Sequence, residues 1–160
     1  MRPTLSRAVI AGFAGTMLVT LGTLFVSPFL RGGSMDLAAI VSDQLSDRWI
    51  AGVAIYLVLG GVILPIIYSF AFYPWLAGSP AQRGMSWGLL LWLISQAIVL
   101  PALGDGFFSA RTGGPTAAIG SLLGHAVYGL VLGFVAGGAH EPTSGPTRHL
   151  GSRFHMRRAG

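Results

Sequence analysis

The chain of 160 residues has no cysteine, no lysine and few charged residues of either sign. Without cysteine it can form no disulfide framework, thiolate zinc site, iron–sulfur cluster or cysteine nucleophile. Charged residues make up 9% of the sequence and hydrophobic residues 52%, whereas soluble domains average about 25% charged residues. So little polar surface cannot cover a water-soluble globule, and the composition predicts an integral membrane protein.

Common catalytic signatures are also missing from the sequence. It contains no HExxH, GxSxG or P-loop pattern, and no pair of carboxylates at the end of an apolar stretch. The three histidines near the C-terminus, His140, His149 and His155, have no spacing typical of metal ligands. We therefore expect a protein that is not an enzyme and has no cofactor.

Four apolar stretches are long enough to cross a membrane, which takes about 20 residues. They lie at 8–30, 49–72, 84–103 and 116–139, and none contains a charged residue. The first is longer than the apolar core of a signal peptide and is followed by no A-x-A-like cleavage site, so we expect it to be retained as a helix. The sequence predicts an all-α bundle of four transmembrane helices within residues 1–139.

The arginines are distributed unevenly between the two sides of this bundle. Three, Arg31, Arg48 and Arg111, lie on one side. Seven lie on the side shared by the N-terminus, the second loop and the C-terminus: Arg2, Arg7, Arg83, Arg148, Arg153, Arg157 and Arg158. The positive-inside rule predicts cytoplasmic termini and a multi-pass protein of the inner (cytoplasmic) membrane. This topology explains the net charge of +5 without nucleic acid as a partner.

The segments outside the spans have distinct compositions. Between 31 and 48, Ser34 can cap a helix with Asp36 in its first turn, and the apolar residues that follow share one face. This pattern predicts a short amphipathic helix on the outer interface. The glycine-rich loop around Phe107 and Phe108 could dip back toward the bilayer through these two rings, but its short length favours an ordinary turn anchored by them.

The C-terminal segment 140–160 is rich in proline, glycine, serine and arginine. Proline, glycine and serine break helices, so this composition predicts a disordered cytoplasmic tail. Four arginines in it could contact anionic lipid, each worth about 1 kcal/mol near the surface; they are Arg148, Arg153, Arg157 and Arg158.

Glycines recur at helix-packing intervals in the third and fourth stretches. They are Gly84, Gly88, Gly120, Gly124, Gly129, Gly133 and Gly137. In lipid, small residues let helix backbones approach closely, so these positions predict a seam with a second copy, a seam within the bundle, or both. We favour an internal seam for at least one set.

Pro65 lies in the middle of the second stretch. Its ring removes a helical hydrogen bond and clashes with the carbonyl of Gly61, which predicts a kink and a carbonyl in need of a donor. Such a break is typical of simple packing, and in some transporters it marks a substrate path.

His125, in the fourth stretch, is the one titratable group other than tyrosine in any of the four. A small set of polar or backbone groups is expected at a similar depth, and forms with it a candidate intramembrane site: Gln96, Ser95, Thr20, Gly61 and Tyr128. His125 could ligate haem, carry protons, or be a neutral side chain hydrogen-bonded across helices. No second histidine and no acidic residue lies in a span, which favours the neutral side chain.

Three sequence segments, PWLAGSPAQRGMSWGLLLWL, GDGFF and GHAVYGLVLG, together with Met35–Asp36, resemble an uncharacterised bacterial family of small four-span membrane proteins. The resemblance implies a four-helix membrane domain without an established activity. It suggests that five residues belong to the family pattern: Arg83, Phe108, His125, Tyr128 and Gly129.

Three functional hypotheses follow. The leading one is a non-enzymatic accessory or scaffold subunit that packs against itself or a larger membrane complex. The second is a small transporter or channel with a path near His125, Gln96 and the Gly61–Pro65 break. The third is a redox or quinone-binding membrane subunit.

Overall fold

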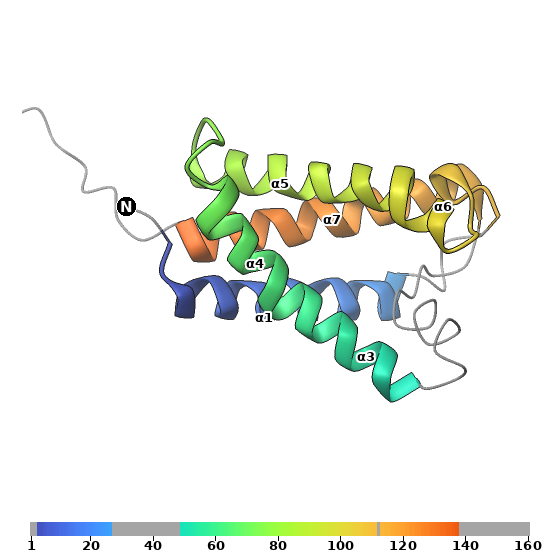
Figure 1. Ribbon diagram of the computed structural model, residues 1–160, viewed down its shortest axis with the longest axis horizontal. Helices are drawn as coiled ribbons and strands as arrows, with labels where there is room; N and C mark the ends of the chain where they lie inside the picture. The colour runs from blue at the N-terminus through green and yellow to red at the C-terminus, as the bar shows by residue number, and fades with distance from the viewer. Residues whose placement is uncertain (1–2, 27–48, 112, 138–160) are drawn as a thin grey trace, which may run out of the picture.

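The computed structural model describes residues 3–26, 49–111 and 113–137 (Figure 1). In this part of the chain, helices are the only regular secondary structure. Four helices are long and apolar enough to cross a membrane: Leu5–Thr23, Ile50–Phe72, Pro80–Ala102 and Gly114–Gly137. The all-α, four-span prediction is confirmed, and the chain is a multi-pass membrane protein. The predicted interfacial helix at 31–48 and tail at 140–160 lie outside the described residues.

The first and fourth spans are single helices, α1 (Leu5–Val26) and α7 (Gly114–Gly137). The second and third spans are interrupted by π-helical turns. The second consists of α3 (Trp49–Val58), a π turn (Leu59–Ile63), α4 (Leu64–Ile67) and a π turn (Tyr68–Phe72). The third consists of α5 (Pro80–Ile94), a π turn (Ser95–Val99) and α6 (Leu100–Ala102).

Each π turn ends two residues before a proline, at Pro65, Pro74 and Pro101. A proline in a helix lacks the N–H that would bond the carbonyl four residues earlier, and its ring clashes with that carbonyl. Widening the preceding turn to i→i−5 bonding moves this carbonyl away. In the second span the residue before Pro65, Leu64, bonds in this wider register to Leu59. The predicted kink at Pro65 is therefore built as a π turn.

α1, α5 and α7 each begin a few residues earlier than the apolar stretches indicate. α1 begins at Leu5, so Arg7 lies within it, and the Arg7 guanidinium donates to the carbonyl of Val135 over 3.0 Å. The last carbonyls of a helix lack intrahelical donors, so Arg7 satisfies one near the end of α7. α5 begins at Pro80 behind a capping box formed by Ser79 and Gln82.

Helix α7 is the centre of the arrangement. α5 runs antiparallel along one side of α7 and α1 along another, as Figure 1 shows. A Cβ added at Gly84 or Gly88 of α5 would collide with the backbone carbonyl of Gly129 or His125 of α7, respectively. The internal glycine seam favoured from the sequence is thus present between α5 and α7, where the backbones are in contact.

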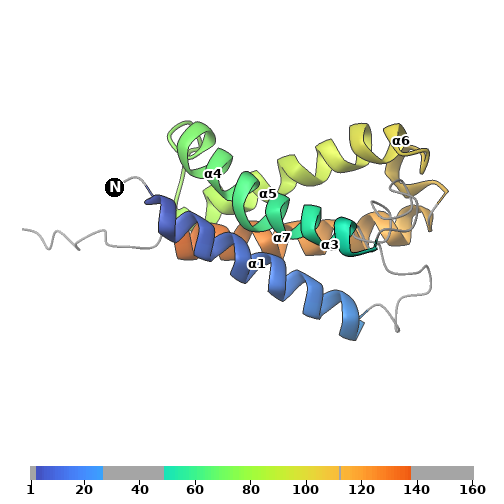
Figure 2. The same ribbon diagram turned by 60° about the horizontal axis from the view of Figure 1, so that its bottom comes forward.

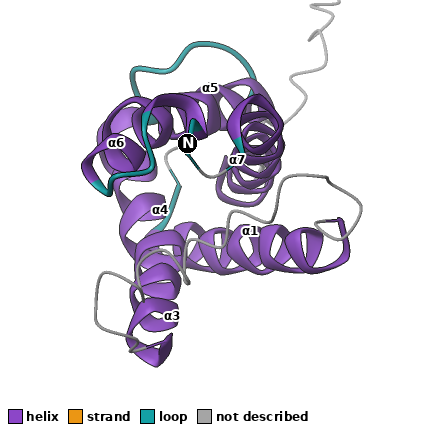
Figure 3. Ribbon diagram, turned by 90° about the vertical axis from the view of Figure 1, so that its right-hand side faces the viewer, coloured by secondary structure: helices purple, strands orange, loops and turns teal. Residues whose placement is uncertain are grey.

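The second span packs against α1 along only part of its length. Its π turn and α4 contact α1, where a Cβ at Gly12 would collide with Pro65. On the N-terminal side of Gly60, α3 leans away from α5 and α7 and packs closely on neither (Figures 1 and 3). The far halves of α1 and of the third span also diverge (Figure 2). Among the described residues, the bundle is therefore closed at the end near loop 73–79, and its helices are spread apart at the other end.

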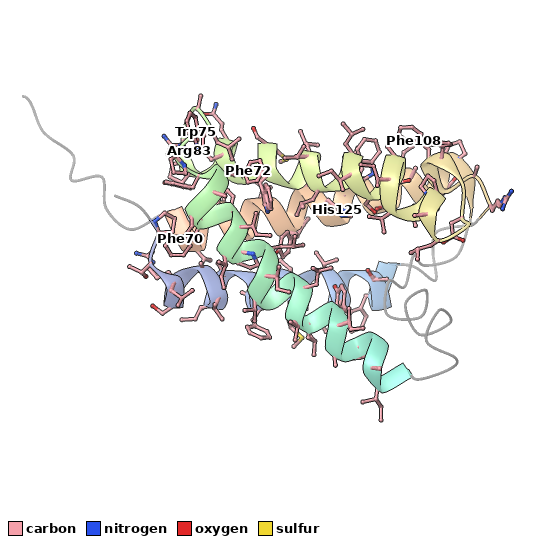
Figure 4. The ribbon with its side chains drawn as sticks, in the orientation of Figure 1. Phe70, Phe72, Trp75, Arg83, Phe108 and His125 are labelled. Carbon is pink, nitrogen blue, oxygen red and sulfur yellow. The ribbon has the colours of Figure 1, made fainter. Side chains whose placement is uncertain are left out.

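An aromatic cluster fills the closed end. The ring of Tyr68, fully buried, packs edge-on against Tyr73 at 5.6 Å and lies 6.0 Å from Trp87. The Arg83 guanidinium lies over the Tyr73 ring at 4.7 Å and donates to the carbonyl of Gly78 over 2.9 Å. Figure 4 shows Arg83 beside this end of the second span. Arg83 thereby fixes loop 73–79 between the second and third spans.

Candidate functional site: two polar clusters between the spans

The predicted intramembrane site is divided into two separate clusters. The first, which we call the Gln96 cluster, consists of Gln96, Ser109, Ser121 and His125. The second, the Tyr128 cluster, consists of Tyr128, Gly60, Thr16, Thr20 and Tyr56. Both include residues of α7, but no hydrogen bond among the described residues joins them.

Gln96 is the centre of the first cluster and is fully buried in the π turn of the third span. Its Nε2 donates to the Ser121 hydroxyl of α7 over 3.3 Å. Its Oε1 accepts a hydrogen bond from the Ser109 hydroxyl over 3.0 Å. Both ends of the amide are therefore satisfied, which a buried amide in hydrocarbon requires.

His125 extends this cluster along α7 toward mid-span (Figure 4). Its Nδ1 lies 2.8 Å from the backbone carbonyl of Ser121 and 3.4 Å from the Ser121 hydroxyl. A carbonyl can only accept, so Nδ1 carries the proton and Nε2 of the neutral ring has a free lone pair. The direct partner is Ser121, one helical turn before His125. Gln96, which the sequence suggested as a neighbour, acts through it.

Ser109 reaches Gln96 because loop 103–113 folds back onto the bundle. Phe108 and Ser109 both have positive φ values, 50° and 58°. This conformation is strained for residues other than glycine. It places the Ser109 hydroxyl in the interior while Phe107 and Phe108 stay exposed. Phe108 packs on Trp92 with ring centroids 5.9 Å apart, and Trp92 donates to the carbonyl of Ala118 over 3.0 Å. Phe108 thus anchors the loop as predicted, and the loop also folds back against the third span and α7. We call this folded-back loop the plug.

The Tyr128 cluster is built on the proline of the second span. The Tyr128 hydroxyl donates to the carbonyl of Gly60 over 2.6 Å. Because the helix is in i→i−5 register here, the N–H that would bond this carbonyl belongs to Pro65, which has none. The carbonyl that needs a donor is therefore that of Gly60. The prediction of Gly61 was wrong by one residue because it assumed α-helical register.

Thr20 belongs to this second cluster and not to the group around His125. Its hydroxyl donates to the carbonyl of Thr16 over 2.8 Å and lies 3.2 Å from the Tyr56 hydroxyl. The Thr16 hydroxyl is buried against Gly60 and has no hydrogen-bond partner in the described chain. These contacts fasten α1 to the second span where the two helices begin to diverge.

The Gln96 cluster does not form a continuous proton relay. The Gln96 amide interrupts any hydrogen-bonded relay between Ser109 and His125, because an amide does not readily pass a proton from one end to the other. No group of three or more histidine, cysteine or acidic residues in the described part could hold a metal ion. What the Gln96 cluster does is fix the ring of His125 in one tautomer.

Of the six predicted site residues, the structure brings His125 and Gln96 into one cluster and Tyr128 and Thr20 into another. Ser95 is half-buried beside Gln96 and Gly61 is buried beside Phe13.

Sequence reasoning missed Ser109, because a strained loop has no sequence signature here. It also missed Gly12 and Gly15 of α1, which contact Pro65 and Tyr128. The small-residue spacing of Ala11 and Gly15 could have indicated them.

Comparison with known proteins gives one match. The family model described as a family of unknown function (DUF6789) matches residues 1–145. No curated protein and no solved structure matches the chain. The sequence resemblance to an uncharacterised family is thus confirmed, and the family supplies no activity.

Proposed function

The chain belongs to the DUF6789 family of unknown function, and from its geometry we propose that it is a non-enzymatic accessory or scaffold subunit of the cytoplasmic membrane. It packs against a partner, a second copy or a larger complex, through the side of the bundle where α3 stands apart. The observation that carries the proposal is the separation of α3 from α5 and α7.

The glycine seam between α5 and α7 does not provide the partner surface. Gly84, Gly88, Gly129 and Gly133 contact one another's helices within the chain, and Gly137 lies against Pro80 and Tyr73. A helix from another chain could not reach these backbones without separating α5 from α7. The contact with a partner must therefore lie elsewhere.

Helix α3 supplies such a surface. Ile50, Ile55 and Val58 are 79%, 45% and 50% exposed, and α3 packs closely on no other described helix beyond its own continuation. α3 meets α1 through the hydroxyls of Tyr56 and Thr20, but no described helix packs closely along its exposed face. Helices associate in lipid through van der Waals packing, which this face does not receive from the described helices. A partner helix lying along α3 would supply that packing.

The absence of charge supports a structural role. The described spans contain no acidic residue, and Arg7 and Arg83 lie near their ends, where each satisfies a backbone carbonyl. Intramembrane charges are the usual mark of ion and proton pathways. The arginine distribution supports cytoplasmic termini, with loop 73–79 on the same side.

Cysteine cross-linking in native membranes tests this proposal, because the chain has no cysteine of its own. We expect Ile55→Cys on α3 to form an adduct with a partner. Leu123→Cys on α7, 62% exposed, is the matched control and should form none. The proposal fails if Ile55→Cys gives no adduct, or if both positions cross-link equally.

A small transporter or channel is the second candidate, favoured by the line of polar groups from Ser109 to His125. A path along it would pass Ser95 and Gln96 and require the Ser109 plug to move. Flux into liposomes that is unchanged by His125→Ala would exclude this path.

A further inference from the structure

His125 has a feature that a scaffold does not need. Its Nδ1–H is committed to the Ser121 carbonyl, and Nε2 has no hydrogen-bond partner among the described residues. A lone pair without a donor, near the middle of a membrane, costs free energy unless a molecule in the membrane supplies the donor. The Ser109–Gln96–Ser121 chain therefore fixes the ring with an acceptor unused.

The position of His125 on α7 indicates where that acceptor lies. Tyr128, three residues later, faces α1 and the second span, whereas Gly129, four residues later, faces α5. Positions three and four apart are neighbours on a helix surface, so His125 lies between these two faces. It faces the space among α1, α5 and the second span.

His125 is only partly buried. The second span leans away from α5 and α7 along α3, which packs closely on neither of them (Figures 1 and 3). The polar atoms that are buried without a partner are on Thr16, Tyr68, Ser69 and Trp87, and Nε2 of His125 is not among them. The described helices therefore do not seal this nitrogen.

We propose that His125 Nε2 accepts a hydrogen bond from the hydroxyl of a neutral, lipid-soluble molecule of the hydroquinone class. The molecule must be neutral because the described spans offer no acidic residue to pair with a cation. It must carry a donor because Nε2 is an acceptor, so a hydroquinone fits and its oxidised quinone does not. Haem is a poorer fit, since His125 is the one histidine in the described spans and no second axial ligand accompanies it.

The test uses the full chain in nanodiscs with three probes of nearly the same shape. They are a decyl-substituted benzohydroquinone, its quinone, and its dimethyl ether, which has no hydroxyl. We expect the hydroquinone to bind at least about tenfold more tightly than the other two, the factor expected for one buried hydrogen bond. Binding should shift the ¹⁵N resonance of the unprotonated His125 nitrogen, which the His125→Phe spectrum identifies.

Two variants separate this site from general partitioning into lipid. His125→Phe keeps a ring of similar size and should lose the preference for the hydroquinone. Thr23→Val removes a hydroxyl of α1 that donates to the Val19 carbonyl of its own helix, outside both clusters, and should retain the preference. Equal binding of all three probes, or a preference that survives His125→Phe in a folded protein, overturns the proposal. This outcome is independent of whether α3 binds a partner.

Discussion

The α5–α7 pair and the pairing of α1 with the second span differ in what holds the helices together. Between α5 and α7, glycines face glycines and the backbones touch over two turns. Between α1 and the second span, close contact ends at Gly60 and Thr16, and a Cβ at Gly22 farther along α1 would meet nothing within 4 Å. In this membrane protein the helices stay together where glycines of both helices face each other, and they diverge where a glycine such as Gly22 meets open space.

The largest expected effect comes from placing a side chain between α5 and α7, where the backbones are in contact. In Gly84→Val, the new Cβ would collide with the Gly129 carbonyl and the Gly133 backbone, and neither can rotate away. We expect the free energy of unfolding in mixed micelles to fall by at least about 3 kcal/mol.

Gly22→Val is the matched control on the diverging pair. A side chain there meets open space, so the free energy of unfolding should change by less than about 1 kcal/mol. Equal losses at both positions would show that the α5–α7 contact is no tighter than the rest of the bundle.

An intermediate effect is expected where α7 meets the second span, at the hydrogen bond from Tyr128 to the Gly60 carbonyl. Tyr128→Phe leaves the Gly60 carbonyl without a donor in hydrocarbon, which should cost about 1–2 kcal/mol of unfolding free energy. Pro65→Ala restores a backbone N–H in this turn, so the cost of Tyr128→Phe should shrink in that background. Strictly additive losses in the double-mutant cycle would refute the assignment of this carbonyl.

The smallest effect is expected at the plug. Ser109→Ala and Ser109→Gly both remove the hydroxyl that bonds Gln96, but only glycine relieves the positive φ of 58°. Ser109→Gly should therefore be more stable than Ser109→Ala by about 1 kcal/mol, measured in the same unfolding assay. If Ser109→Ala is the more stable of the two, the backbone at Ser109 is not strained.

The four membrane-spanning helices could be predicted from the sequence, because charge-free apolar stretches of about 20 residues are typical of transmembrane helices. The sequence also predicted an internal glycine seam, although not which helices form it; the structure shows Gly84 and Gly88 meeting Gly129 and Gly133. It could not divide the polar residues into two clusters, because depth in the membrane does not specify which face a residue occupies. The Gly60 carbonyl was missed for a different reason: a π turn changes register without changing the sequence pattern.

The central claim is the separation of α3 from α5 and α7. Distances between pairs of spin labels, measured by double electron–electron resonance, test it directly. Spin labels at Ile55 and Ile98 report on the open side, and labels at Leu89 and Val127 report across the α5–α7 pair. In nanodiscs holding one copy of the chain, we expect the first distance to be clearly longer and more broadly distributed than the second. A first distance as short and as narrow as the second would show a closed four-helix bundle and contradict the account.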